Sequence, residues 1–255
     1  MTHRTAGRRG VVAGAVLACA LFGLSCNAVR EDRRGCPCTL AVEMRSLPLC
    51  PVWLYADGRP AGQALKDTCL AVQVPKGPLA LLTAVAGASS SDGLSVHIPL
   101  GEEAPPLYAW SVWADCSSDQ GSATVCLRRH FCTLALEVVS PPGWAQPFRV
   151  EVRGEVDGWS LAAGKPIPGP FRCPLSAGFR CRLPRHRPGD ELWLDVVMPE
   201  GVVRTFSLGE ALRRAGYDWT AEDLPDIGLR LDLSVTEIRL VCEGFGPPIP
   251  VEIVI

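Results

Sequence analysis

Residues 148–153 read FRVEVR, a stretch in which apolar and charged side chains alternate. Successive side chains of an extended strand point to opposite faces. Phe148, Val150 and Val152 would therefore lie on one face, and the charged side chains of Arg149, Glu151 and Arg153 on the other. One such face is suited to a core and the other to water, as in many antiparallel sheets. The stretch predicts a β-strand on the surface of an apolar core.

Short runs of this kind recur along the chain and are separated by Gly, Pro, Ser or Asp. The chain contains 25 Gly and 23 Pro among 255 residues, which is too many for long helices but suits turns. Short alternating strands with frequent turns are typical of β-sandwiches. We therefore predict an all-β fold, with further strands at residues 40–44, 70–74, 94–98, 192–196, 229–233 and 251–255.

Only the segment after residue 206 has helical spacing of its apolar residues. Leu208, Ala211 and Leu212 would share one face of a helix. Ser207 is placed as the N-cap with Glu210 three residues later, the spacing of a capping box. Gly216 stands where a helix end favours a left-handed residue. We expect one short helix followed by a turn.

The first 25 residues resemble an export signal. Residues 1–10 are basic, and residues 11–25 form an apolar run that is shorter than the ~20 residues needed to cross a bilayer. The remainder is expected to be exported and water-soluble. Export also accounts for 12 Cys, which can form structural disulfides outside a reducing cytosol.

Cys26 directly follows the apolar run and a small residue, Ser25, which is the setting of a lipidated cysteine. Cys19 is the alternative, although it leaves a shorter apolar run before it. We predict that Cys26 carries the lipid. Loss of Cys19 with the signal and use of Cys26 for lipid would leave 12 − 2 = 10 cysteines, an even number that can pair.

The other cysteines favour disulfides over metal binding. Cys36 and Cys38 form a C-x-C pair, which is not the usual C-x2-C zinc spacing, and both are expected in disulfides. Cys173 and Cys181 have the spacing of two strands in a hairpin, which predicts a bond between them. No metal and no cofactor are expected.

The chain divides into four predicted parts. These are the signal (1–25), a lipidated N-terminus with a charged spacer (26–35), a first β-domain (36–121) and a second β-domain (122–255). The boundary is placed near Gly121, because residues 115–125 form a polar interruption before a new alternating run. Either β-domain is large enough for a sandwich of about seven strands.

The sequence contains none of the common catalytic motifs. The chain lacks the nucleophile elbow, the zinc-binding H-E-x-x-H, the P-loop and the dinucleotide-binding fingerprint. His97, His130 and His186 are too scattered to propose a triad and are interpreted as ordinary strand or loop residues. We predict that the protein is not an enzyme.

The charge of the chain does not favour a nucleic-acid partner, and none is expected. The net charge is −2, and removal of Arg4, Arg8 and Arg9 with the signal makes it −5, whereas nucleic-acid affinity depends on clustered Lys and Arg.

A group of acidic residues in the second domain lacks the spacing of a calcium-binding EF-hand loop. We interpret them as helix caps and turn residues: Asp218, Glu222, Asp223 and Asp226.

Two tryptophans of one predicted strand could form a sugar-binding surface. Trp110 and Trp113 are three residues apart, so they lie on opposite faces and one of them is expected to be exposed. We favour the interpretation that these tryptophans pack in the sandwich core or at a domain interface over the interpretation that they bind sugar.

Several stretches together resemble the FimB-type fimbrial anchor family of the Bacteroidales, which builds the type V pilus. The most specific are residues 152–171 (VRGEVDGWSLAAGKPIPGPF) and 206–227 (FSLGEALRRAGYDWTAEDLPDI). Residues 52–60, 74–77 and 126–138 add to the likeness, as do Cys26, Glu31, Asp32, Cys36 and Pro37. Residues 86–107 match thinly.

The resemblance implies two transthyretin-like Greek-key β-sandwiches in tandem, with one short helix in the second. It also implies a lipoprotein of the cell outer membrane that faces the cell surface and joins stalk or accessory pilin subunits by strand addition. The chain end, Val251, Glu252, Ile253, Val254 and Ile255, is the candidate partner strand or an edge strand that closes the second sandwich. The competing function is a surface lipoprotein whose Ig-like modules bind glycan or another nutrient.

Overall fold

The predicted alternating runs form strands in the structure, a computed structural model in which residues Pro37–Ile255 make one compact unit. In β1 (Cys38–Arg45) buried and exposed residues alternate without exception, with Leu40, Val42 and Met44 in the core. This period of two is the reason that the segment is extended. The structure describes residues 35–45, 48–65, 69–139, 148–175, 178–198, 201–232, 239–243, 249–251 and 253–254.

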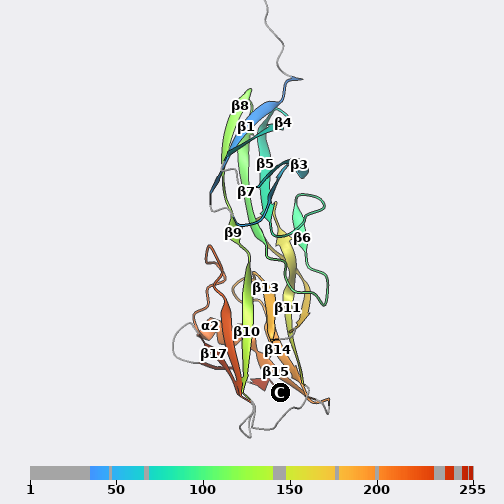
Figure 1. The fold of residues 1–255 in the computed structure, drawn as a ribbon, viewed down its shortest axis with the longest axis vertical. Helices are drawn as coiled ribbons and strands as arrows, with labels where there is room; N and C mark the ends of the chain where they lie inside the picture. The colour runs from blue at the N-terminus through green and yellow to red at the C-terminus, as the bar shows by residue number, and fades with distance from the viewer. Residues whose placement is uncertain are drawn as a thin grey trace, which may run out of the picture. The chain divides into compact units, whose positions relative to one another are not determined.

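Two sheets face each other in the first sandwich (Figure 1). Their apolar side chains form one buried cluster that includes Leu40, Leu54 and Leu82. The smaller sheet has the order β4 (Cys69–Val74), β1, β8 (Gln120–Cys126). The larger has the order β3 (Arg59–Ala64), β2 (Val52–Ala56), β5 (Gly77–Ala86), β7 (Tyr108–Cys116), β9 (Arg128–Arg129).

The second sandwich has its own core, which includes Leu134, Val152 and Phe206. One sheet has the order β13 (Arg180–Pro184), β10 (Phe131–Val139), β16 (Ile227–Asp232), β17 (Arg239–Glu243), β18 (Ile249–Val251). The other has the order β12 (Lys165–Pro174), β11 (Arg149–Ser160), β14 (Leu192–Val197), β15 (Val203–Ser207), β19 (Ile253–Val254), and β6 (Ser95–His97) also pairs with β11.

Both sandwiches begin with the same arrangement of strands. β1 pairs antiparallel with β4 and parallel with β8, and β10 pairs antiparallel with β13 and parallel with β16. The prediction of an all-β chain with two tandem sandwich domains is confirmed.

The sequence between β5 and β7 connects the two sandwiches. His97 of β6 pairs with Gly158 of β11, and Ile98 and Ala104 pack in the core of the second sandwich. Gly121, the expected domain boundary, lies inside β8, whose pairing with β1 continues to Cys126. Residues from both halves of the chain therefore build the region where the sandwiches meet.

The expected helix is present as α2 (Leu208–Arg214), the one helix among the described residues. It buries Leu208, Ala211 and Leu212, and Gly216 has a φ of 77° just after its end, as expected. Ser207 is the N-cap residue, but its side chain makes no capping hydrogen bond. The expected capping box is wrong, because the Glu210 carboxylate pairs instead with arginines one turn later. In the part of the chain that the structure describes, no helix has the length and apolar character to cross a membrane.

Candidate functional site

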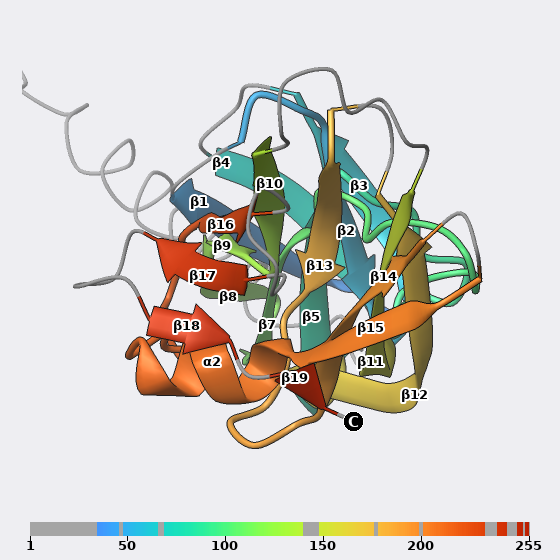
Figure 2. The same ribbon diagram turned by 90° about the horizontal axis from the view of Figure 1, so that it is seen from below.

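The predicted site residues lie partly within the described chain. Cys26, Glu252 and Ile255 are outside the described residues. Val251 ends β18, which pairs with β17 and lies beside α2, and β19 pairs with β15 (Figure 2). The end of the chain thus occupies the last position in each sheet of the second sandwich.

Cys173 and Cys181 lie next to each other in the core of the second sandwich, where their thiols share a hydrogen bond. The hydrogen bond with Cys173 and burial raise the pKa of the Cys181 thiol. The expected hairpin is wrong, because β12 belongs to one sheet and β13 to the other. The two residues face each other across the sandwich, and both are free thiols in the structure.

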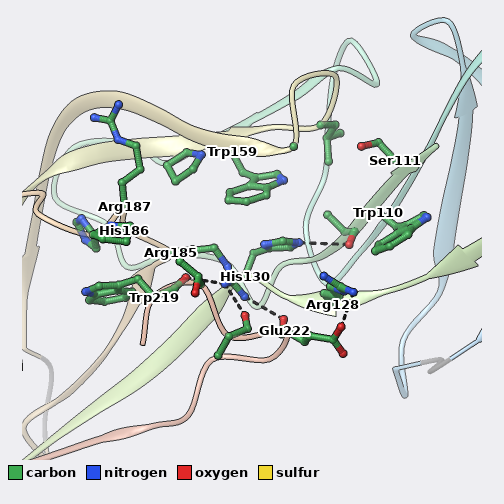
Figure 3. A pocket seen from close by; sticks show the side chains of 17 residues that line it. Trp110, Ser111, Arg128, His130, Trp159, Arg185, His186, Arg187, Trp219 and Glu222 are labelled. Atoms are coloured by element: carbon green, nitrogen blue, oxygen red, sulfur yellow. Dashed lines mark hydrogen bonds and ion pairs between the residues drawn. The ribbon is translucent and has the colours of Figure 1, made fainter. Parts of the chain in front are cut away.

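A cleft of about 350 Å³ lies where β7, β9, β11 and the loop before β16 converge (Figure 3). Three tryptophans from distant parts of the chain line it, and basic and acidic side chains stand between them. Trp110 comes from β7, Trp159 from β11 and Trp219 from the loop after α2. The cleft is also lined by Arg128, His130, Arg185, His186 and Glu222.

Arg185 is buried beneath this cleft and fixes the loop that carries Trp219. Its Nη1 donates hydrogen bonds to the carbonyl oxygens of Trp219 and Ala221 at 2.7 and 2.6 Å. Its Nη2 donates to the carbonyl oxygens of Arg129 and Glu222 at 2.8 and 3.0 Å. Burial lowers the pKa of this guanidinium. One arginine therefore joins the loop after α2 to the strand β9 through four main-chain acceptors.

His130 lies against Trp159, with ring centroids 3.9 Å apart and the planes tilted by 31° (Figure 3). Its Nε2 is 3.3 Å from the carbonyl oxygen of Ala109. Burial, followed by the positive charge of Arg185, lowers the pKa of His130 to about 3. The imidazole is therefore neutral at physiological pH and acts as a packing group.

His186 is 2% exposed and contacts Trp219 edge-on, with ring centroids 5.0 Å apart. Neither ring nitrogen has a hydrogen-bond partner among the described residues. Burial lowers the pKa of His186 to about 4, although Asp190 opposes the shift. The sequence placed His186 in a basic turn, and the structure shows it in the floor of the cleft.

The mouth of the cleft is polar. Arg128 pairs with Glu222 at 2.6 Å, and its guanidinium lies 4.9 Å from the ring centroid of Trp110. The Nε1 atom of Trp110 is buried without a hydrogen-bond partner in the described chain. Aromatic faces beside polar groups can stack on the apolar face of a ring and hydrogen-bond to its edge. The cleft is suited to binding and holds no nucleophile–base pair among its lining side chains.

Three of the four acidic residues assigned to caps and turns have another role. Glu222 pairs with Arg128, and Asp223 accepts a hydrogen bond from the backbone N–H of Arg129 at 2.7 Å. Asp226 pairs with the Arg129 side chain. Only Asp218 caps a turn, by accepting the Thr220 N–H at 2.7 Å. Within the described residues, no group of three His, Cys, Asp or Glu side chains is placed to hold a metal ion.

The structure confirms the prediction that Trp110 and Trp113 lie on opposite faces of one strand and that one of them is exposed. Trp113 is 60% exposed on the outer face of β7, and Trp110 is half-buried and lines the cleft. Sequence reasoning missed Trp159, Trp219 and Arg185. Residues 152–171 and 206–227, which carry the resemblance, contain both missed tryptophans, but nothing in the sequence indicates that they meet.

Comparisons with known proteins identify the fold and not a sequence family. The sequence matches no protein-family model and no curated protein. The fimbrial anchor protein Mfa2 from Porphyromonas gingivalis is 14% identical, with a TM-score of 0.57 over 85% of this chain and 100% of that one.

Two solved structures from Bacteroides are similar to the same extent. A candidate polysaccharide-binding protein from Bacteroides thetaiotaomicron is 13% identical, with a TM-score of 0.58 over 85% of this chain and 98% of that one. A candidate adhesin from Bacteroides ovatus is 12% identical, with a TM-score of 0.56 over 89% and 99%. Over most of its length the chain therefore has the tandem-sandwich fold of a fimbrial anchor protein and of candidate adhesins.

Proposed function

We propose that this chain is a non-enzymatic, lipid-anchored protein of the cell outer membrane that anchors a fimbria or forms one of its accessory subunits. The observation that carries the proposal is the fold, which 85% of this chain shares with the whole of a fimbrial anchor protein. The export signal and the residues that resemble the FimB-type family support the same function. Fimbrial stalk or accessory pilin subunits are the proposed partners.

The proposed tether is Cys26, at the start of a charged spacer that ends before the folded unit at Pro37. A single acyl chain binds a membrane only marginally, whereas two or more chains give a stable anchor. A cysteine that carries several chains would hold the protein at the membrane and leave both sandwiches free to bind partners.

Strand addition requires a sheet edge, and two edges of the second sandwich are closed to a partner. β12 contains Pro166, Pro168, Pro170 and Pro174, and proline cannot donate to a strand ladder. β13 is covered, because Arg182 donates its N–H to Glu103 and accepts the Ala104 N–H at 3.0 Å. A partner strand has no continuous ladder to join at either edge.

The opposite edges are held by the end of the chain, through few pairs. β15 pairs with β14 at five positions, but among the described residues it pairs with β19 only at Thr205 and Phe206. β18 pairs with β17 at three positions. Short pairing is easily exchanged, so we propose that Val251, Glu252, Ile253, Val254 and Ile255 exchange with a strand of a neighbouring subunit.

The test is metabolic labelling with a palmitate analogue in cells that make the wild-type chain or Cys26→Ser. We expect Cys26→Ser to lose the label and to move from the membrane fraction to the soluble fraction, because its anchor is gone. Fimbriae should then be found in the medium rather than on the cells.

Cys19→Ser is the matched control and should keep the label. Label that persists in Cys26→Ser would disprove the assignment, and fimbriae that stay attached to cells would contradict the anchoring function. A variant that lacks Pro250–Ile255 examines strand exchange. If it folds but no longer co-purifies with pilin subunits, exchange is supported, and if it fails to fold, the segment closes the second sandwich.

Glycan binding is the second candidate function, and the tryptophan-lined cleft favours it. If a sugar stacks on Trp110, Trp110→Ala should weaken polysaccharide binding at least ~10-fold, equivalent to about 1.4 kcal/mol, in affinity electrophoresis. Trp113→Ala is the control, because its side chain lies outside the cleft on the same strand. No retardation of the wild-type protein by any polysaccharide would exclude this function.

A further inference from the structure

Two cysteines meet in the core of the first sandwich. Cys38 is the first residue of β1 and Cys116 is the last residue of β7, so they belong to different sheets. Both are 0% exposed, and their side chains share a hydrogen bond. Both are free thiols in the structure, buried next to each other where the two sheets face each other.

The backbone around these cysteines holds them together. The chain leaves β7 at Cys116, turns, and returns as β8 beside β1. At this turn the Thr39 N–H donates to the carbonyl oxygen of Asp119 at 2.9 Å, directly after Cys38. A Cβ on Gly121 would lie 2.8 Å from the carbonyl oxygen of Asp115, so glycine allows β8 to pass close to the end of β7, with the Cys38 Sγ atom in ordinary contact at 3.5 Å. The contact therefore follows from strand pairing and does not depend on the rotamer of one surface side chain.

Some other cysteines of the chain lack such a cysteine partner, whereas one further pair resembles Cys38 and Cys116. Cys36 and Cys69 are exposed, and the buried Cys132 has the Tyr217 hydroxyl as its hydrogen-bond partner. The contact between Cys173 and Cys181 is the counterpart in the second sandwich, because it also joins two sheets. Among the described residues, each sandwich thus has a pair of facing thiols, and immunoglobulin domains likewise have one inter-sheet disulfide.

We propose that Cys38 and Cys116 form a disulfide that links the two sheets of the first sandwich. The oxidant is the disulfide of a thiol–disulfide oxidoreductase in the compartment to which the chain is exported. One cysteine thiolate attacks that disulfide and forms a mixed disulfide. The second thiolate then displaces the oxidoreductase, which leaves as a dithiol with the two electrons and the two protons that the cysteine thiols have lost.

The reaction belongs to folding rather than to the finished protein. Burial, together with the neighbouring Cys38, raises the pKa of Cys116 to about 11. The thiolate is the nucleophile, so the closed core suppresses attack on an external oxidant. Once formed, the bond is protected from reduction by the same burial.

Peptide mapping of the exported protein without reductant tests the proposal. Trypsin and Asp-N together would release residues 35–45 and residues 115–118, and the second peptide contains Cys116 alone. The first contains both Cys36 and Cys38, so the mapping uses Cys36→Ser. We expect the two peptides to be joined and to separate on reduction. Alkylated thiols on both peptides after unfolding without reductant would overturn the proposal, as would a link between the two peptides that persists in Cys38→Ser.

Thermal unfolding gives a second readout. The bond closes a long loop, which restricts the unfolded chain, so reductant should lower the Tm of the wild-type protein by roughly 10 °C. In Cys38→Ala/Cys116→Ala this decrease should shrink. An equal decrease in the double variant would assign the effect to other cysteines and contradict the link. If the double variant does not fold, peptide mapping alone decides.

Discussion

Arg185→Ala is expected to lower the free energy of unfolding by about 3–5 kcal/mol, the range seen when a buried polar network loses its central donor. The guanidinium serves four carbonyl oxygens, of Arg129, Trp219, Ala221 and Glu222. Alanine would remove the donors from these four acceptors, of which the Trp219 carbonyl oxygen makes a fully buried hydrogen bond. Urea unfolding monitored by tryptophan fluorescence measures the change.

Two further variants make this result specific. Arg187→Ala removes a charge from the same turn, but that side chain is 51% exposed and pairs with Asp190, so we expect a loss below about 1 kcal/mol. Arg185→Lys should recover little, because an ammonium cannot reproduce the planar fork of donors. Equal losses in Arg185→Ala and Arg187→Ala would show that Arg185 does not hold the loop.

Acid is expected to destabilise the protein through its buried histidines. The pKa of His186 is lowered from 6.5 to about 4 by burial. Above pH 6.5 the ring is neutral in both states and stability is complete. As the pH falls toward 4, the unfolded chain binds the proton and the folded chain does not. The unfolding free energy should therefore fall by about 1.4 kcal/mol per pH unit for this group.

His186→Phe tests this dependence. Phenylalanine keeps an aromatic ring beside Trp219 and removes two nitrogens that lack partners among the described residues. Between pH 7.5 and pH 4.5 we expect the variant to lose about 2–3 kcal/mol less than the wild type. His97→Phe, at an exposed position, should behave as the wild type. An unchanged pH dependence in His186→Phe would contradict the buried neutral histidine.

The class of fold could be predicted because its signal is local. The alternation of FRVEVR and of β1 has a period of two, which is a property of neighbouring residues and of strand geometry alone. The helix at 208–214 and the left-handed Gly216 were likewise visible in a short window. The prediction of a capping box was wrong because the Glu210 carboxylate pairs with nearby arginines instead.

The contacts that build the cleft could not be predicted in this way. Arg129 and Asp223 are 94 residues apart, and the sequence placed the acid in a turn. Cys173 and Cys181 have the spacing of a hairpin, but they lie in opposite sheets rather than in one hairpin. Spacing limits how far apart two residues can be and does not decide the sheet that each strand joins.

The sequence by itself determined that this chain is built from strands with one apolar and one polar face, and it predicts export and a lipidated Cys26. The tertiary structure alone decided which side chains share a site. Trp110, Trp159, Trp219 and Arg185 meet because distant strands pair and because residues 95–107 cross between the sandwiches. Such pairing depends on the burial of whole faces and therefore on the complete fold.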